Sequence, residues 1–216
     1  MPVSATRSAL CCLLIGGAGI VGNAAPAVAQ TAPERGVFVT QIGENSRADV
    51  TQQNSDSLAR IVQDGDGNQL DLDQTGSAAH RAQIAQDGDG NSVTAQQDGD
   101  GTATLALAQE GDANTAILLQ RELSSAGETN AAVVQRGNGN TVILAQDGSD
   151  NNASLNQVGD NNIMTATQLN SGNRLEWTQT GDGLADLGIT QTGNGSLQVT
   201  QSATGAQFAP PPGSGG

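Results

Sequence analysis

The sequence lacks much of what globular domains normally use for a core and for catalysis. Its 216 residues contain no lysine and no tyrosine, one tryptophan, two phenylalanines and one histidine. Acidic residues outnumber basic ones 22 to 8, and the formal charge is −14, which argues against nucleic acid or an anionic membrane as a partner. So polar and aromatic-poor a composition is typical of disorder. The regular periodicity of the chain argues against disorder here.

Both cysteines fall in a segment with the features of a secretory signal peptide. Residues 1–29 contain one arginine, an apolar run over residues 9–21 and the cleavage pattern Ala27-Val28-Ala29. The run is too short to span a membrane as a helix. A lipid-anchored Cys11 or Cys12 is an alternative, but neither follows the apolar segment that such a site requires. The remainder of the exported chain then has no cysteine and is stabilised without disulfides.

A glutamine recurs every 10 to 12 residues, with one longer interval, and it divides the chain into fifteen short units. Such an internal period must be recognised first, because it determines the fold class. The fifteen glutamines are Gln41, Gln52, Gln63, Gln74, Gln86, Gln97, Gln109, Gln120, Gln135, Gln146, Gln157, Gln168, Gln179, Gln191 and Gln201.

The residues two and four places before each glutamine are apolar in all fifteen units, as at Leu70 and Leu72 before Gln74. The residues between them are mostly polar or small, as at Asp71 and Asp73. This alternation with period two predicts strands with one buried face. Two strands and two turns make roughly 22 residues, so the chain is predicted to be all-β: a β-solenoid of two stacked sheets with between seven and eight rungs, stabilised by stacking.

Turns are predicted two places after the glutamines, where glycine stands in 11 of the 15 units and asparagine (Asn54, Asn170) in two more. Glycine and asparagine tolerate positive φ, which a tight reversal requires. The turn glycines singled out are Gly65, Gly88, Gly99, Gly111, Gly137, Gly148 and Gly159.

The position six places before the glutamine is asparagine in seven units and serine in two, at Ser46 and Ser57. By alternation these amides face the same side as the apolar pair, where a buried amide needs a hydrogen-bond partner. Stacked amide ladders would supply one. The alternative is that these residues merely favour turns at the strand ends. The asparagines are Asn68, Asn91, Asn114, Asn140, Asn151, Asn162 and Asn173.

These residues resemble the curlin repeat, S-x5-Q-x-G-x-x-N-x-A-x3-Q, over residues 37–201. Residues 57–74 match it with leucine in the alanine place, residues 109–120 match from their glutamine onward, and residues 140–157 match apart from Asn140 in the serine place. The resemblance implies a structural subunit of extracellular curli fibres, a functional amyloid of bacterial adhesion and biofilm matrix. It also implies a homopolymer, other curlin-like subunits as partners, and outer-membrane export and nucleation machinery reached through the periplasm.

The domains expected are thus the signal peptide (1–29), a short amino-terminal segment (30–36), the repeat solenoid (37–201) and a disordered Pro/Gly-rich tail (202–216). Residues 121–129 interrupt the period and are interpreted as a tolerated loop, or alternatively as a secretion or partner loop. Three DGDG turns, at residues 64–67, 87–90 and 98–101, suggest calcium but lack a distal glutamate.

No catalytic grouping, cofactor motif or metal cluster is recognised, and His80 at a strand start is not expected to bind metal or act as a base. The sequence therefore predicts a protein that is not an enzyme. The alternative to a fibre subunit is a monomeric secreted β-solenoid that binds calcium or a surface ligand. Monomeric solenoids need polar caps, but the first and last strands, over residues 36–41 and 195–201, carry neither charge nor proline. Open ends at both strands are expected, which favours the fibre.

Overall fold

The regular secondary structure of the described residues consists of strands alone. A computed structural model describes residues 35–203 and 205–209, and the expected signal peptide and short segment up to residue 34 lie outside them. In the described part there is no helix that could span a membrane. The strands are β1 (Gly36–Ile42), β2 (Arg47–Gln52), β3 (Leu58–Asp64), β4 (Gln69–Gln74), β5 (Arg81–Asp87), β6 (Ser92–Gly99), β7 (Thr102–Glu110), β8 (Thr115–Glu122), β9 (Glu128–Arg136), β10 (Thr141–Gly148), β11 (Asn152–Val158), β12 (Ile163–Leu169), β13 (Arg174–Thr180), β14 (Ile189–Thr192), β15 (Ser196–Ser202) and β16 (Gly205–Ala209).

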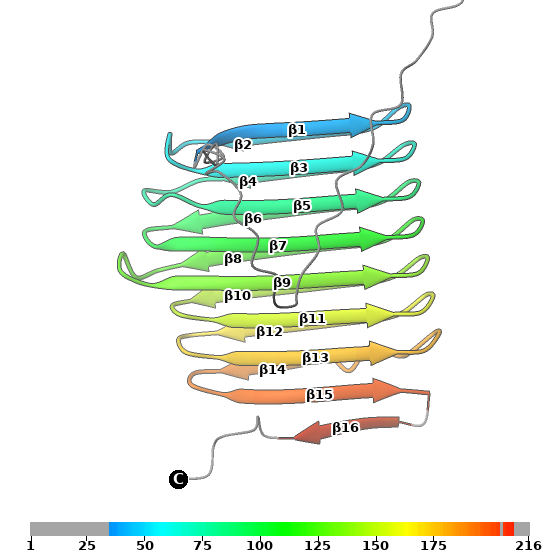
Figure 1. The fold of residues 1–216 in the computed structure, drawn as a ribbon. Coiled ribbons are helices and arrows are strands. Elements are labelled where there is room, and N and C mark those ends of the chain that lie inside the picture. Colours follow the sequence, from blue (N-terminus) through cyan, green and yellow to red (C-terminus); the bar gives the residue numbers. More distant parts are fainter. Residues whose placement is uncertain (1–34, 204, 210–216) are drawn as a thin grey trace, which may run out of the picture. The chain divides into compact units, whose positions relative to one another are not determined.

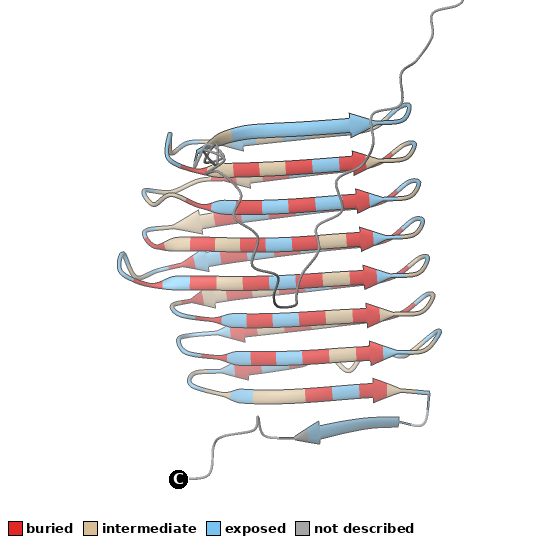
Figure 2. Ribbon diagram, viewed as in Figure 1, coloured by how far each residue is buried: buried red, intermediate tan, exposed pale blue. Residues whose placement is uncertain are grey.

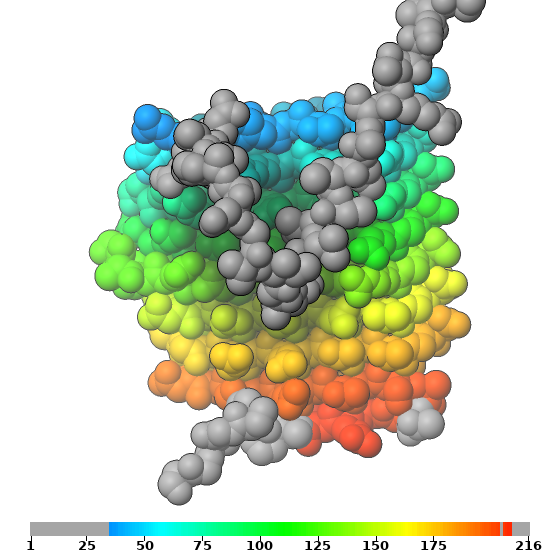
Figure 3. Space-filling view, in the orientation of Figure 1, coloured from blue at the N-terminus to red at the C-terminus, as the bar shows by residue number. Residues whose placement is uncertain are grey.

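The odd-numbered strands together with β16 form one sheet, and the even-numbered strands from β2 to β14 form a second sheet that faces it (Figure 1). Sheet A has the order β1-β3-β5-β7-β9-β11-β13-β15-β16, and sheet B has the order β14-β12-β10-β8-β6-β4-β2. All pairs are parallel except β15–β16. One rung is therefore one strand of each sheet, and successive rungs form bands along the stack (Figure 3). The predicted all-β solenoid of stacked strand–turn–strand repeats is confirmed.

Alternation of the side chains places one stripe of each internal strand between the sheets, as the alternating buried residues show (Figure 2). In β5 the buried residues are Ala82, Ile84 and Gln86, while the residues between them are exposed. Because the strands pair in register, apolar residues of adjacent strands lie next to one another. Ile84, for example, lies beside Ile61 on one side and Leu107 on the other. No rung has an apolar core of its own, so the core is the sum of these stacked pairs.

The turns after the strands of sheet A require glycine for two reasons. Gly65 has φ +118°, and a Cβ placed on it would lie 2.2 Å from the carbonyl oxygen of Gly88 in the next rung. A side chain is thus excluded by the close stacking of successive turns as well as by the backbone conformation. Among the asparagines expected at reversals, Asn170 has φ +65°, but Asn54 does not have positive φ. The Asn54 side chain instead accepts a hydrogen bond from the backbone N–H of Asp56, which forms an Asx turn.

The interruption at residues 121–129 covers the end of β8, the connection to β9 and the start of β9. It lies at the edge of the sheets, where it protrudes beyond the neighbouring turns (Figure 1). Its tip needs no place in the core, and the pairing of β9 with β7 and β11 continues in register across it.

The carboxy-terminal segment differs from the expectation of disorder. β16 pairs with β15 in the antiparallel direction, with Val199 opposite Phe208 and Gln201 opposite Ala206. The expectation missed β16 because residues 205–209 lack the glutamine period, and an antiparallel edge strand needs only backbone hydrogen bonds. The expectation that the last strand is open is therefore wrong for the sheet A edge at β15.

Candidate functional site: the amide ladders and the ends of the stack

The fifteen glutamines stand in two columns, one along each sheet. In sheet A the Nε2 of Gln41 donates to Oε1 of Gln63 at 2.6 Å, and Gln63 donates to Gln86 at 2.7 Å. The pattern repeats through Gln109, Gln135, Gln157 and Gln179 to Gln201 at 2.9–3.0 Å. In sheet B it runs from Gln52 through Gln74, Gln97, Gln120, Gln146 and Gln168 to Gln191 at 2.6–3.1 Å. Every donor lies on the amino-terminal side of its acceptor, so both columns have a direction.

In the rungs after the first, the second hydrogen of each glutamine amide is donated across the stack. Gln63 in sheet A donates to the carbonyl oxygen of Arg47 at the start of β2, at 3.2 Å. Gln146 in sheet B donates to the carbonyl oxygen of Asn130 in β9, at 3.0 Å. Both side chains are fully buried. Buried amides with their donors satisfied hold the facing sheets together at the strand ends, where the apolar pairs do not reach.

The asparagines form two shorter columns beside the turns. Asn68 accepts the backbone N–H of Asn91 at 2.9 Å, and the series continues through Asn114 and Asn140 to Asn162. The Nδ2 of Asn68 also donates to the carbonyl oxygen of Gly88 at 2.8 Å. Asn151 and Asn173 belong to the column at the opposite turns, where Asn151 accepts the N–H of Asn173 at 3.1 Å. The asparagines thus fix the turn backbone of the following rung.

His80 occupies a position in this second column. It is fully buried, its Nδ1 accepts the backbone N–H of Ala103 at 3.1 Å, and its Nε2 lies 2.5 Å from the carbonyl oxygen of Thr75. Nδ1 is therefore an acceptor and Nε2 carries the hydrogen. Burial lowers the pKa of His80 below the ordinary value of 6.5, against smaller opposing effects of Thr75 and Asp98. His80 replaces asparagine as a structural acceptor.

Glu122 is a buried carboxylate where other units have the turn glycine. Its Oε1 accepts the backbone N–H of Ser124, and its Oε2 accepts the Thr129 hydroxyl and the backbone N–H of Asp150, each at 2.8 Å. The side chain is fully buried. Three donors to one carboxylate anchor the long β8–β9 connection to the next rung. Its place two residues after Gln120, where 13 of the 15 units have Gly or Asn, was the signal in the sequence.

A column of aspartates follows the turns after sheet A and was missed by the sequence reasoning. Asp66 Oδ1 accepts the N–H of Glu44 at 2.6 Å, Asp89 accepts from Asp66, and Asp112 accepts from Asp89. Two DGDG turns contribute to this column, whereas the third, at residues 98–101, follows a strand of sheet B on the other edge. The stacked aspartates therefore act as acceptors for turn amides.

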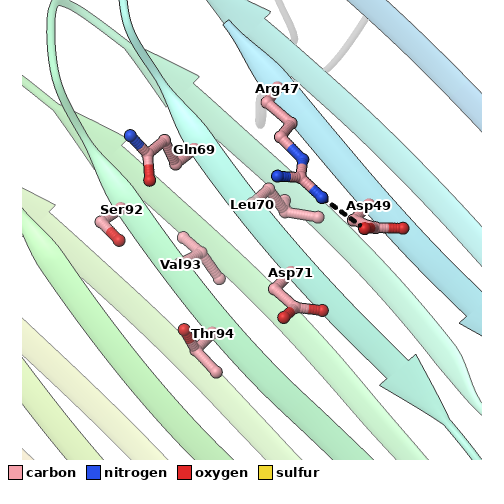
Figure 4. Close-up of a pocket in the computed structure, with 8 residues that line it drawn as sticks. All are labelled: Arg47, Asp49, Gln69, Leu70, Asp71, Ser92, Val93 and Thr94. Atoms are coloured by element: carbon pink, nitrogen blue, oxygen red, sulfur yellow. Dashed lines mark hydrogen bonds and ion pairs between the residues drawn. The ribbon is translucent and has the colours of Figure 1, made fainter.

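The described residues offer no metal site. No group there of three or more His, Cys, Asp or Glu side chains could hold a metal ion. A shallow depression of about 240 Å³ lies over β2, β4 and β6 (Figure 4). Arg47 points along β2 toward Asp49, with 2.8 Å between Nη2 and Oδ2. Both side chains are largely exposed, so the pair contributes little to stability.

The amino-terminal end of the stack leaves inward-facing residues uncovered. Val37 and Val39 of β1 are 44% and 43% exposed, whereas the equivalent Ala59 and Ile61 of β3 are 0% and 1% exposed. Among the described residues nothing donates to the Oε1 of Gln41 or of Gln52. At the other end Gln201 is 6% exposed, and its Nε2 donates to the carbonyl oxygen of Ala185. One end of the stack therefore presents amide acceptors and the other end presents amide donors.

Comparison with protein-family models finds the curlin associated repeat in two overlapping stretches, residues 128–159 and 137–169. These stretches include β9 to β12 and four of the ladder glutamines. No curated protein and no solved structure matches the chain.

Proposed function

The chain contains curlin associated repeats, and we propose that it is a structural subunit that polymerises into extracellular curli-type amyloid fibres. The repeat family and the solenoid fold are structural rather than enzymatic. The observation that carries the proposal is that the two ends of the stack differ. One end exposes Val37, Val39 and Gln41, and these residues have the same inward pattern of two apolar residues and a glutamine as the internal strands. A second copy stacked on this end would bury these three side chains, as the neighbouring rung buries the equivalent side chains inside the stack.

The wider role follows from the resemblance to curlins. We propose that residues 1–29 are a signal peptide, that the subunit is exported through the periplasm by an outer-membrane machinery with its own nucleation step, and that the fibres serve adhesion and biofilm matrix. The amide columns are the proposed polymerisation elements. They can be extended from copy to copy without any change in their hydrogen-bond pattern.

A monomeric secreted solenoid is the second candidate, and β16 favours it. A strand across the edge of β15 is the device by which sheet proteins prevent further pairing. On this alternative β16 is a permanent cap. On the fibre proposal it is a removable one.

Electron microscopy and amyloid-dye binding on the purified chain distinguish the two candidates. The fibre proposal predicts unbranched filaments and a rise in dye fluorescence that follows loss of monomer. A chain that stays monomeric and dye-negative, with its sheet structure intact, would instead support the capped solenoid.

A further inference from the structure

The number of parallel strands is odd, and this fixes how two copies can join. In the part of the chain that the structure describes, sheet A contains eight parallel strands, the odd-numbered β1 to β15, whereas sheet B contains seven, the even-numbered β2 to β14. Among the described residues no strand of sheet B lies at the level of β15. We propose, on the premise that the chain forms fibres, that successive copies stack head to tail with a half-turn rotation about the stack axis. In this arrangement β1 of the second copy pairs with β14, and its β2 pairs with β15.

The rotation keeps the strands that meet at the junction parallel. Strands of sheet A and sheet B run in opposite directions on the two sides of the stack (Figure 1). A half-turn about the stack axis moves sheet A of the second copy to the side of sheet B and reverses the direction of its strands in space. The second copy's β1 is then parallel to β14. Without the rotation, β1 would stack on β15 and leave sheet B with a gap of one strand at the level of β15.

The two sheets are interchangeable because their strands carry the same inward pattern. β1 presents Val39 and Gln41 inward, and β14 presents Ile189 and Gln191, with the same spacing. β2 presents Val50 and Gln52, and β15 presents Val199 and Gln201. The rotated junction therefore stacks apolar on apolar and amide on amide in both sheets. Each sheet of one copy continues as the other sheet of the next copy.

The direction of the amide columns selects head-to-tail stacking. Internal glutamines donate once across to the facing sheet and once to the next glutamine. Within the described residues Gln201 donates only once, across the stack to the carbonyl oxygen of Ala185, so its other hydrogen can be donated to Oε1 of Gln52 in the second copy. Gln191 donates to Gly195 at 3.2 Å in addition to Arg174, and it must release Gly195 to reach the second copy's Gln41. Two amino-terminal ends placed together would oppose acceptor to acceptor.

β16 occupies the position that the second copy's β2 requires. It lies beside β15, with Phe208 opposite Val199, on the edge where β2 would pair in the parallel direction. Phe208 is 60% exposed, so this strand buries less apolar surface than an internal strand does. Displacement of β16 by β2 is therefore a necessary step of each addition.

Disulfide cross-linking between copies tests the rotation. Thr40, Thr190, Thr51 and Thr200 are exposed on outer faces, and the rotated junction places the second copy's Thr40 beside Thr190 and its Thr51 beside Thr200. Neighbouring strands are about 4.8 Å apart, within the Cα separation that a disulfide accepts. Residues 40 and 190 lie at opposite ends of one copy, so a bond between them can only join two copies.

Three double variants are prepared in a chain with Cys11→Ser and Cys12→Ser, assembled under reducing conditions and then oxidised. Thr40→Cys with Thr190→Cys and Thr51→Cys with Thr200→Cys are expected to give a ladder of covalent multimers. Thr40→Cys with Thr200→Cys is expected to remain monomeric on a non-reducing gel. Multimers from that control pair would show stacking without rotation, and fibres in which no pair cross-links would equally overturn the inference. Failure of the unsubstituted chain to form any fibre is a different result, which refutes the proposed function itself.

Discussion

Gln63 and Gln86 lie side by side in adjacent strands of sheet A, joined by a hydrogen bond of 2.7 Å from Nε2 to Oε1, and both are fully buried. Each is at once a donor to the next rung and an acceptor from the previous one. Removal of one such side chain therefore affects three rungs.

Gln146→Ala is expected to destabilise the solenoid. The substitution leaves Gln120 without its acceptor and Gln168 and Asn130 without a donor. Unsatisfied buried groups cost ~1–3 kcal/mol each. A lower midpoint in denaturant unfolding and slower fibre growth are the expected results. Thr94→Ala on the outer face is the control, with a change expected within ~0.5 kcal/mol. Equal effects of the two substitutions would refute a structural role for the inward amides.

Gly65→Ala and Gly67→Ala separate the effect of stacking from that of backbone conformation. Both glycines have positive φ, but a Cβ on Gly65 would meet the Gly88 carbonyl oxygen at 2.2 Å, whereas a Cβ on Gly67 would meet nothing within 4 Å. Gly67→Ala should cost about 1–2 kcal/mol for the left-handed conformation. Gly65→Ala should cost clearly more, as measured by denaturant unfolding. The opposite order would mean that successive turns are not stacked this closely.

Stability should fall below pH 6.5 because of His80. Burial lowers its folded-state pKa, so the unfolded chain binds the proton more readily and the free energy of unfolding decreases as the pH falls through 6.5. The loss levels off once the pH is below the folded-state pKa. Protonation of Nδ1 would also remove the acceptor for Ala103. Unfolding midpoints measured from pH 8 to pH 5 test this, with a reference curve from His80→Asn.

His80→Asn introduces the residue type that this column has at positions 151 and 173, where Asn151 accepts the backbone N–H of Asn173. The variant should lose the fall in stability that His80 causes as the pH drops below 6.5. A variant with an unchanged pH profile would show that His80 is not the titrating group.

Deletion of residues 203–216 should shorten the lag before fibre growth. The deletion removes β16 and frees the edge of β15 for a second copy. Deletion of residues 210–216 alone keeps β16 and should leave the lag near that of the full chain. Dye-binding kinetics at matched concentration compare the three chains. If both deletions behaved alike, β16 would have no part in controlling addition.

The strands and sheets could be predicted from the sequence because each rung repeats the same local pattern. Apolar residues at alternate positions determine which face is buried, and a constant interval between glutamines keeps the strands in register. Trp177 illustrates this: it lies between Leu155 and Val199 in sheet A, as its phase predicts.

The remaining features depend on contacts between rungs that no single repeat reveals. The two edges of the stack differ: turns after sheet A stack Asp66 on Asp89, whereas turns after sheet B contain His80 and Glu122. From the sequence all turns were predicted as one class, so this difference between the two edges was not predicted. β16 was missed for a related reason, since an antiparallel cap follows no repeat.

Spin labelling at one outer position tests most directly whether the fibre consists of stacked solenoids. Thr94→Cys, in a chain with Cys11→Ser and Cys12→Ser, carries one label per copy on the outer face of β6. If each copy contributes its full stack of rungs, labels in successive copies are separated by about 35 Å along the stack axis at the usual strand spacing. The fibre spectrum should then show immobilised but separate spins. A single exchange-narrowed line would place identical residues about 4.8 Å apart, as in fibrils of one strand layer per copy, and would contradict the account.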